Sequence, residues 1–374
     1  MENIYDLRKK LHKNPEKGFE EFKTKEILLD YLERFKDKIR INDVLKTGLI
    51  IEYKGDPDKD EYIFYRADMD ALPIEEKTEV PFKSRNDGWM HACGHDMHMT
   101  ILMGILQKIV TSMEKINILF FYQPAEEGPG GAEPFLKTGF LSNYKIKACL
   151  GLHVNGHYKV GEIATRPGPF FSSPTEFDVV FKGTSSHGAL PHLGKDAIIA
   201  ASNFLNITYE KVFRDLPNYE EYAFTIGVLN GGTRRNVIAE RAVLEGSYRV
   251  FSKKTDKEIK KIIEDNSKYI SKLFNMESEV SYGASYPVLE NDVELYNELV
   301  DVLENHPVKF INSEKNYTGE DFAFFSQKYP SLFFWLGCGN ENMHRPLHDN
   351  LFLPDEKCIE VGITTVLDLI NKIW

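Results

Sequence analysis

Apolar residues follow a helical spacing at the start of the chain and a strand-like pattern soon afterwards. Ile4, Leu7 and Leu11 predict a first helix, a second apolar run at 27–35 predicts another, and Pro15 lies between the two runs. Strands are then expected at 47–54, 62–67, 116–122 and 147–153, with a Met- and Leu-rich helix at 96–113. Strands alternating with helices predict a layered α/β domain with a mostly parallel sheet.

The pattern changes after residue 170. The expected elements are a strand at 176–182, a helix at 195–213, strands at 222–230 and 241–251, a helix at 255–274 and a strand at 277–282. This β-α-β-β-α-β order is typical of a ferredoxin-like α+β domain. A strand at 331–337 and a helix at 355–373 then resume the first pattern. We therefore expect one α/β domain, 1–172 and 287–374, interrupted by a smaller domain at 173–286.

Composition narrows the class of protein. A chain of 374 residues is long enough for two domains, and its net charge of −11 without a basic run argues against nucleic acid as the main partner. No apolar stretch reaches the ~18 residues of a membrane span, and the charged N-terminus lacks the apolar core of a signal peptide. The four cysteines are few and scattered, as in reducing compartments. We expect a cytoplasmic protein.

Potential metal ligands are concentrated between His91 and His98, where three histidines and one cysteine fall within eight residues. Thiolate and imidazole are the side-chain donors that suit zinc-like ions best. The Cys93-x-His95 pair is not a Cys-x-x-Cys redox motif. The stretch therefore indicates a metal site that needs further ligands from elsewhere.

The further candidates follow predicted strands. Asp68 and Asp70 end one strand, Glu126 and Glu127 follow another, and His153 ends a third. Ligands of open α/β sheets bind beyond the carboxyl ends of the strands, so these side chains should converge there. Taken singly, each has an ordinary structural explanation, such as a turn cap or a satisfied polar residue. Their joint occurrence favours a metal site, since paired carboxylates need a nearby positive charge.

Four motifs give the chain a family resemblance. They are His-Ala-Cys-Gly-His-Asp at 91–96, Gln-Pro-Ala-Glu-Glu-Gly at 123–128, Tyr-Arg-Ala-Asp-x-Asp-Ala-Leu-Pro at 65–73 and Leu-His-x-Asn at 152–155. Together they resemble the M20 metallopeptidase clan, in particular its amidohydrolase branch. The resemblance implies a zinc-exopeptidase-like catalytic domain with an inserted lid and dimerisation domain. Within the branch, the segment 126–134 and the chain length most resemble the N-acetyldiaminopimelate deacetylases, which release acetate from N-acetyl-L,L-diaminopimelate in lysine biosynthesis.

The resemblance also implies roles for single residues. Two divalent ions, whether zinc, cobalt, nickel or manganese, are expected to be held by Cys93, His95, Glu127, His153 and His348, with Cys93 as a bridging thiolate. Glu126 is expected to be the general base. Glu127 stays an alternative for that role. Adjacent side chains at a strand end point to opposite sides, which supports one glutamate as the base and the other as a metal ligand. Asp68 is the preferred catalytic carboxylate behind the metals, and Asp70 is its alternative.

The inserted domain is expected to contribute substrate contacts and an interface. By resemblance, His187 helps to stabilise the oxyanion, while Asn236 and Arg249 contact an N-acetyl amino acid substrate. A guanidinium suits a substrate carboxylate through paired hydrogen bonds. Family members often dimerise through this domain, so a homodimer is expected.

Three other functions remain open. The first is a general N-acyl-amino-acid amidohydrolase of the aminoacylase or hippurate-hydrolase type, which a mainly apolar pocket would favour. The second is a hydrolase with Cys93 as nucleophile and His91 or His95 as base, which would keep its activity after chelation. The third is a catalytically inactive binding protein, in which substitution of Glu126 or Glu127 would change nothing.

Overall fold

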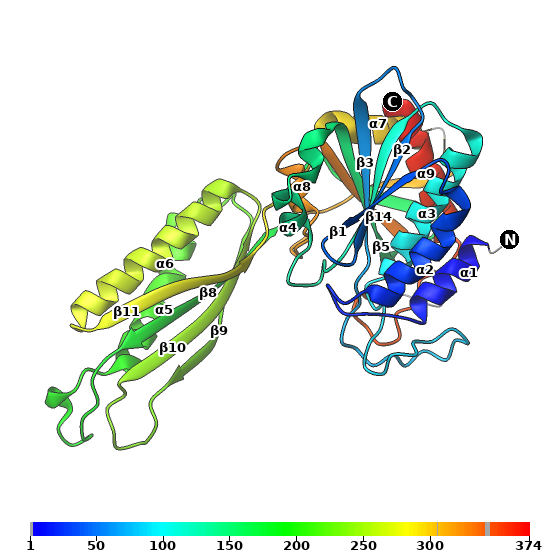
Figure 1. Cartoon of the computed structure of the whole chain (residues 1–374). Coiled ribbons are helices and arrows are strands. Elements are labelled where there is room, and N and C mark those ends of the chain that lie inside the picture. The colour runs from blue at the N-terminus through cyan, green and yellow to red at the C-terminus, as the bar shows by residue number, and fades with distance from the viewer. Residues whose placement is uncertain (1–2, 305, 341–344) are drawn as a thin grey trace. The chain divides into compact units, whose positions relative to one another are not determined.

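The computed structural model describes residues 3–304, 306–340 and 345–374. The chain forms two compact units (Figure 1): the first comprises residues 1–168, 290–314 and 321–374, and the second comprises 169–289 and 315–320. The sequence patterns had placed the limits of the inserted domain at 173 and 286. In the structure, this unit is made of two stretches of the chain, and the second stretch has only six residues.

An eight-stranded sheet forms the centre of the first unit, in the order β1-β2-β4-β3-β5-β14-β6-β13. Its strands are β1 (Arg40–Val44), β2 (Gly48–Lys54), β3 (Glu61–Asp68), β4 (Asn117–Gln123), β5 (Lys145–Lys159), β6 (Glu162–Thr165), β13 (Lys309–Asn312) and β14 (Ser331–Gly339). Strands β4, β3, β5 and β14 run parallel, as expected. The sheet as a whole is mixed, because β2 pairs antiparallel with β1 and β4, and β6 pairs antiparallel with β14.

Five helices pack against one face of this sheet. They are α1 (Ile4–His12), α2 (Phe22–Leu32), α3 (His95–Ser112), α7 (Val293–Glu304) and α9 (Cys358–Ile373). Their apolar faces share one core with alternate residues of the strands, for example Ile63 and Tyr65 of β3. Phe64, which points to the other face, contacts Phe135 and Phe325 of the short helices α4 (Ala132–Lys137) and α8 (Ala323–Ser326). The sheet is thus covered on both faces, as its almost uninterrupted apolar strands require.

The second unit has the β-α-β-β-α-β order that the sequence predicts. It consists of β8 (Ser173–Lys182), α5 (Ala197–Asp215), β9 (Tyr222–Gly231), β10 (Arg241–Val250), α6 (Lys253–Leu273) and β11 (Glu277–Ser285). The strands form an antiparallel sheet in the order β11-β8-β10-β9. Both helices lie along one face of this sheet (Figure 1), and together they enclose a separate apolar core. This is the ferredoxin-like arrangement.

Several short segments complete the two units. Strands β7 (Gly168–Phe171) and β12 (Leu289–Asn291) form a two-stranded sheet of their own, and one-turn helices lie at Glu33–Phe35, Phe140–Asn143 and Pro191–Leu193. Within the described ranges, no helix combines the length and the apolar character needed to cross a bilayer.

Candidate metal centre

The candidate ligands meet where the central parallel strands end. Asp68 closes β3 opposite Gln123, the last residue of β4, so the Glu126–Glu127 segment starts beside Asp68. On the other side of β3, Arg66 lies opposite Gly151 of β5, which brings His153 level with Asp68. The expected convergence at the carboxyl ends of the strands is therefore present in the structure.

A tight turn brings Cys93 and His95 to the same edge. Gly94, at the start of α3, has a φ of 84°, a left-handed conformation that favours glycine. A Cβ atom at Gly94 would lie 2.4 Å from Cγ2 of Val154, the residue after His153. Glycine thus allows the turn to pack directly against β5, and this contact brings the Cys93 thiol close to the His153 ring.

Cys93, His95 and His153 form the buried part of the cluster, with donor atoms within 4.8 Å of one another. The Cys93 Sγ and His153 Nε2 atoms are 3.3 Å apart. The Nδ1 atom of His153 donates to the Val154 carbonyl oxygen at 2.7 Å, and that of His95 donates to the Asp70 carbonyl oxygen at 2.9 Å. Since a carbonyl oxygen only accepts, both rings carry a proton on Nδ1. In the neutral rings, Nε2 then carries a free lone pair that can bind a metal ion.

Glu127 and His348 form the more exposed part. Cys93, Glu127 and His348 make a second group of potential ligands, and Glu127 also groups with His95 and Glu126. His348 Nε2 lies 3.2 Å from Glu127 Oε1, and the backbone amide of His348 donates to the Ala92 carbonyl oxygen at 2.9 Å. The backbone bond holds the His348 segment beside Cys93, although the two are distant in sequence.

Asp68 belongs to a buried network behind these groups. Its Oδ2 accepts from Arg66 at 2.8 Å, and its Oδ1 accepts from His98 Nδ1 at 2.6 Å. His98 Nε2 in turn accepts from the amide of Val154 at 2.9 Å, which requires the proton on Nδ1. His98 therefore connects Asp68 to the strand that carries His153.

Asp70 has different partners. Its Oδ2 accepts from the amide of Glu127 at 2.9 Å, and its Oδ1 lies 3.3 Å from His95 Nδ1. Asp70 is 1% exposed, so it is a buried connection between His95 and the Glu127 segment, beyond the turn cap considered from sequence. Both aspartates thus support the candidate ligands. Asp68 is connected through His98 to the strand of His153, and Asp70 contacts His95 and the Glu127 amide.

The first helix holds the other side of the Cys93–His95 turn. The Oδ2 atom of Asp96 lies 2.9 Å from Arg8 Nε and 2.8 Å from His12 Nδ1, and all three side chains are fully buried. Burial opposes ionisation of Asp96, but Arg8 and His12 together outweigh it and hold the pKa of this carboxyl far below its usual range. An ionised Asp96 therefore ties the start of α3 to α1.

The charges in the cluster are unbalanced without a cation. Burial, followed by the nearby carboxylates of Glu127 and Glu126, raises the pKa of the Cys93 thiol well above its usual value. Burial alone would lower the pKa of His95, but the Asp68 and Asp70 carboxylates raise it to about 10. A divalent cation would reverse both tendencies, because it favours the thiolate and the neutral imidazole.

The donor set fits divalent metal ions. His95 Nε2 is buried and finds no hydrogen-bond partner among residues 3–304, 306–340 and 345–374, although Asp68 Oδ2 lies 3.8 Å away. A buried polar nitrogen without a partner is costly, and a bound ion would remove that cost. One thiol, three imidazoles and a carboxylate occur in overlapping groups of potential ligands, and these donor types suit zinc-like ions.

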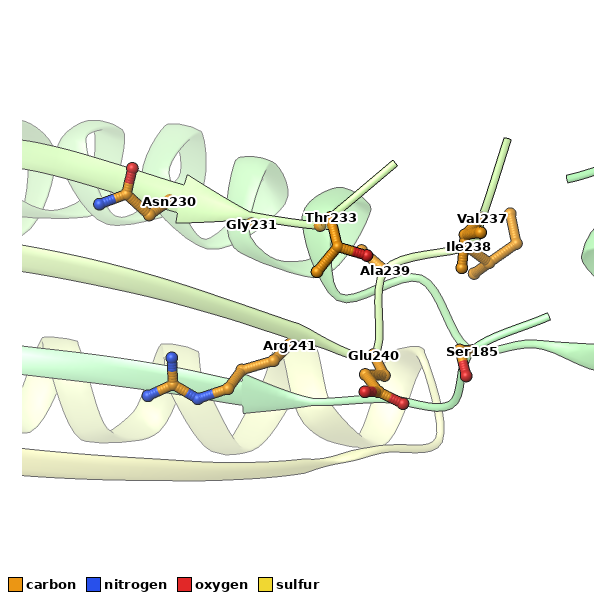
Figure 2. A pocket seen from close by; sticks show the side chains of 10 residues that line it. Ser185, Asn230, Gly231, Thr233, Val237, Ile238, Ala239, Glu240 and Arg241 are labelled. Atoms are coloured by element: carbon orange, nitrogen blue, oxygen red, sulfur yellow. The ribbon is translucent and has the colours of Figure 1, made fainter. Parts of the chain in front are cut away.

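The three expected substrate contacts lie in the second unit. His187 is bridged to Val237, and the Asn236 carbonyl oxygen accepts from the Gly188 amide at 2.8 Å, so the His187 and Asn236 loops are neighbours. Arg249 lies on β10 and donates to the Tyr317 carbonyl oxygen at 3.1 Å. Figure 2 shows a pocket of about 550 Å³ next to these loops, lined by Ser185, Asn230, Gly231, Gly232, Thr233, Val237, Ile238, Ala239, Glu240 and Arg241.

The sequence patterns did not predict that Arg66, His98 and Asp321 form hydrogen bonds beside the cluster of potential metal ligands. Arg66 donates to Asp68 and to Asp321 Oδ1, and Asp321 Oδ2 accepts from the amides of Gly131 and Ala132. A signal existed for His98, which lies one helical turn after His95 and shares its face of α3. The segment Gly319-x-Asp321 resembles a family element near the site, but the partners of Asp321 could not be predicted, since they are 190 and 255 residues away in sequence.

Known proteins resemble this chain over its whole length. N-acetyldiaminopimelate deacetylase of Bacillus subtilis strain 168 is 39% identical over 97% of this chain and 96% of its own, and that of Bacillus pumilus is 38% identical over 99% and 98%. The crystal structure of Bacillus subtilis YXEP protein, described as a dinuclear metal-binding peptidase of family M20, superposes with a TM-score of 0.85 at 30% identity and covers 98% of this chain and 96% of its own.

The sequence model of peptidase family M20/M25/M40 matches residues 64–372, a range that contains every metal-ligand candidate. The family resemblance seen in the motifs is thereby confirmed, together with a fold of catalytic and inserted domains. The chain belongs to peptidase family M20/M25/M40.

Proposed function

We propose that the protein hydrolyses N-acetyl-L,L-diaminopimelate to acetate and L,L-diaminopimelate. The observation that carries this proposal is the 36–39% identity, over nearly the whole chain, to five proteins named N-acetyldiaminopimelate deacetylase. The cluster of Cys93, His95, Glu127, His153 and His348 supports a metal-dependent hydrolysis of the amide.

Two divalent ions are the cofactors in this proposal, as in the dinuclear relative YXEP. Cys93, His95, His153, Glu127 and His348 would hold them, with Cys93 as a thiolate ligand. When bound, such ions supply Lewis-acid polarisation of the scissile carbonyl. The Nδ1–H bonds of His95 and His153 to backbone carbonyls keep both Nε2 atoms directed into the cluster.

Glu126 is the proposed general base. It is 7% exposed, and its side chain belongs to the same group of donor atoms as His95 and Glu127. A carboxylate there can take one proton from the attacking water and deliver it to the nitrogen as the amide C–N bond breaks. Glu127, which pairs with His348, is left for metal binding. Asp68 would keep the cluster in place through Arg66 and His98.

Substrate recognition is assigned to the second unit. His187 would stabilise the oxyanion, while Asn236 and the guanidinium of Arg249 would bind polar and carboxylate groups of the substrate. We also propose a homodimer through this unit. Large apolar side chains of its helices are exposed, including Phe213, Tyr269 and Leu273, and β9 is one of the two edge strands of its sheet.

The test is turnover by the purified protein with added zinc, cobalt, nickel or manganese. We expect N-acetyl-L,L-diaminopimelate to be deacetylated with a higher kcat/KM than N-acetylmethionine or hippurate, and the activity to disappear on chelation. Efficient cleavage of the latter two compounds, without acetate release from the first, would make the protein a general N-acyl-amino-acid amidohydrolase. Activity that survives chelation would instead point to Cys93 as a nucleophile.

A further inference from the structure

We infer that Glu21 is a positioning residue, which holds the turn that presents Glu126 and Glu127. The inference rests on the proposed function only in the roles given to those two glutamates. Glu21 precedes α2 and lies outside the four motifs that identify the family. It is 105 positions before Glu126 in the sequence.

The contacts of Glu21 connect two remote segments. Its side chain is fully buried. The Oε1 atom accepts from the amide of Ala125 at 2.9 Å, and the Oε2 atom accepts from the hydroxyl of Thr47 at 2.6 Å. Because each oxygen has its own donor, the carboxyl group is fixed in one orientation and holds the Ala125 amide directly before Glu126.

Ala125 is a backbone position that requires such support. Its φ is 58°, in the left-handed region that is sterically unfavourable for alanine. Two glycines allow close approach to the same turn: a Cβ atom at Gly18 would lie 2.8 Å from the Ala125 Cβ, and one at Gly48 would lie 2.9 Å from the Pro124 Cδ. The segment around Glu21 therefore packs directly against the strained residue and binds its amide.

Hydrogen bonds also hold the turn on the side that follows Glu126. The Glu127 amide donates to Asp70 Oδ2 at 2.9 Å, and the Gly130 amide donates to the Ala125 carbonyl oxygen at 3.0 Å. Glu126 thus lies between two amides, each bound to a buried carboxyl group. Loss of the Glu21 bond should let the Ala125 turn relax and redirect the Glu126 side chain, while the Asp70 bond still holds Glu127.

The test compares Glu21→Ala and Glu21→Gln in the metal-loaded enzyme. The amide of Gln can still present an oxygen to the Ala125 amide and a donor to Thr47. We expect Glu21→Ala to lower kcat by on the order of 10- to 100-fold, as for a misplaced catalytic group, with KM and metal content nearly unchanged. Glu21→Gln should restore most of kcat. Hydrogen exchange followed by mass spectrometry should become faster at 124–128 in Glu21→Ala only.

Leu28→Ala is the matched control, since it removes a fully buried side chain from α2, the helix that Glu21 precedes. If Leu28→Ala lowers kcat as much as Glu21→Ala does, at a similar loss of melting temperature, Glu21 is merely structural and the inference is wrong. Unchanged exchange at 124–128 in Glu21→Ala would also overturn it. If Glu21→Ala does not fold, Glu21→Asp decides by the same measurements, because its shorter side chain withdraws the carboxylate.

The exchange measurement needs no substrate. It therefore tests Glu21 even if the wild-type protein fails to release acetate from N-acetyl-L,L-diaminopimelate, a result that would contradict the proposed function alone.

Discussion

The two units hold their proposed functional groups in opposite ways. In the first unit, Asp68, His95 and His153 are buried, and each is fixed by hydrogen bonds to its neighbours. In the second unit, Asn236 and His187 both lie on exposed loops. The ring of His187 makes a local bond, in which Nδ1 accepts from the amide of Ala189 at 3.1 Å.

This difference matches the demands of the two proposed tasks. Metal ligands must be held within a fraction of an ångström, and that precision requires rigid support. Groups that bind a substrate must let it enter and leave, which exposed loops permit. We therefore expect changes to the buried groups Cys93, Asp68, His95 and His153 to affect metal binding and stability, and changes to His187 or Asn236 to affect catalysis alone.

The largest effect is expected from Cys93→Ser. A hydroxyl is a much weaker ligand than a thiolate, so metal affinity should fall by more than about 100-fold, and activity should fall with it. Metal content measured after dialysis against a weak chelator checks this. Cys149→Ser is the control, because Cys149 is equally buried in β5 yet belongs to none of the potential metal groups found among the described residues. Loss of metal from both variants would mean that burial, not ligation, explains the result.

A smaller effect on the same unit is expected from Asp68→Asn, which leaves the fully buried Arg66–His98 network without its central charge. Breaking a buried pair costs about 3–5 kcal/mol, so urea unfolding of the metal-free protein should occur at much lower concentration. His187→Ala should leave the urea concentration at the midpoint of unfolding unchanged and lower kcat/KM instead. The comparison of the two units fails if His187→Ala destabilises the protein as much as Asp68→Asn does.

Glu61→Gln is the control for Asp68→Asn. Glu61 begins the same strand, β3, and pairs with Lys145 at 2.8 Å on the surface. An exposed pair contributes roughly 0–1 kcal/mol, so this variant should unfold close to the wild type.

The smallest effect concerns pH. Burial raises the pKa of Glu21 to about 7, so between its ordinary pKa and this value the folded protein binds more protons than the unfolded chain. The contribution of Glu21 to the stability of the metal-free wild type should therefore decrease as pH rises from 5 to 8. Glu21→Gln cannot ionise, so relative to wild type it should gain about 3 kcal/mol over that interval. Urea titrations at both pH values measure the gain. An equal difference at pH 5 and pH 8 would contradict the raised pKa.

The sequence predicts best where an element is apolar on nearly all sides. Strands β3, β4 and β14 and helix α3 all appear close to their expected positions, because almost all their residues are buried. Strands β1 and β13 were not predicted, since they are short and only partly buried at the sheet edges. Helix α7 was also missed, although Leu295, Leu299 and Leu303 recur every four residues.

In the candidate site, too, the sequence predicts some residues and not others. Every ligand candidate could be found, because Cys, His and paired Glu are unusual at strand ends and occur in motifs. The supporting contacts could not: Glu21 is one of many glutamates in the chain, and only the fold shows that it binds the Ala125 amide. The roles of Cys93, His95, Glu127, His153 and His348 as metal ligands stay predictions until they are tested, as do those of Glu126, Asp68, His187, Asn236 and Arg249.

The order of strands in the main sheet has a consequence for synthesis on the ribosome. Strand β14 lies between β5 and β6, yet it is translated only after the entire second unit. Until then β5 has an open apolar edge, the type of surface on which nascent chains associate. The second unit encloses its own core and can fold during this interval. His348 emerges later still, so a newly made chain can collect its complete set of proposed metal ligands only near the end of translation.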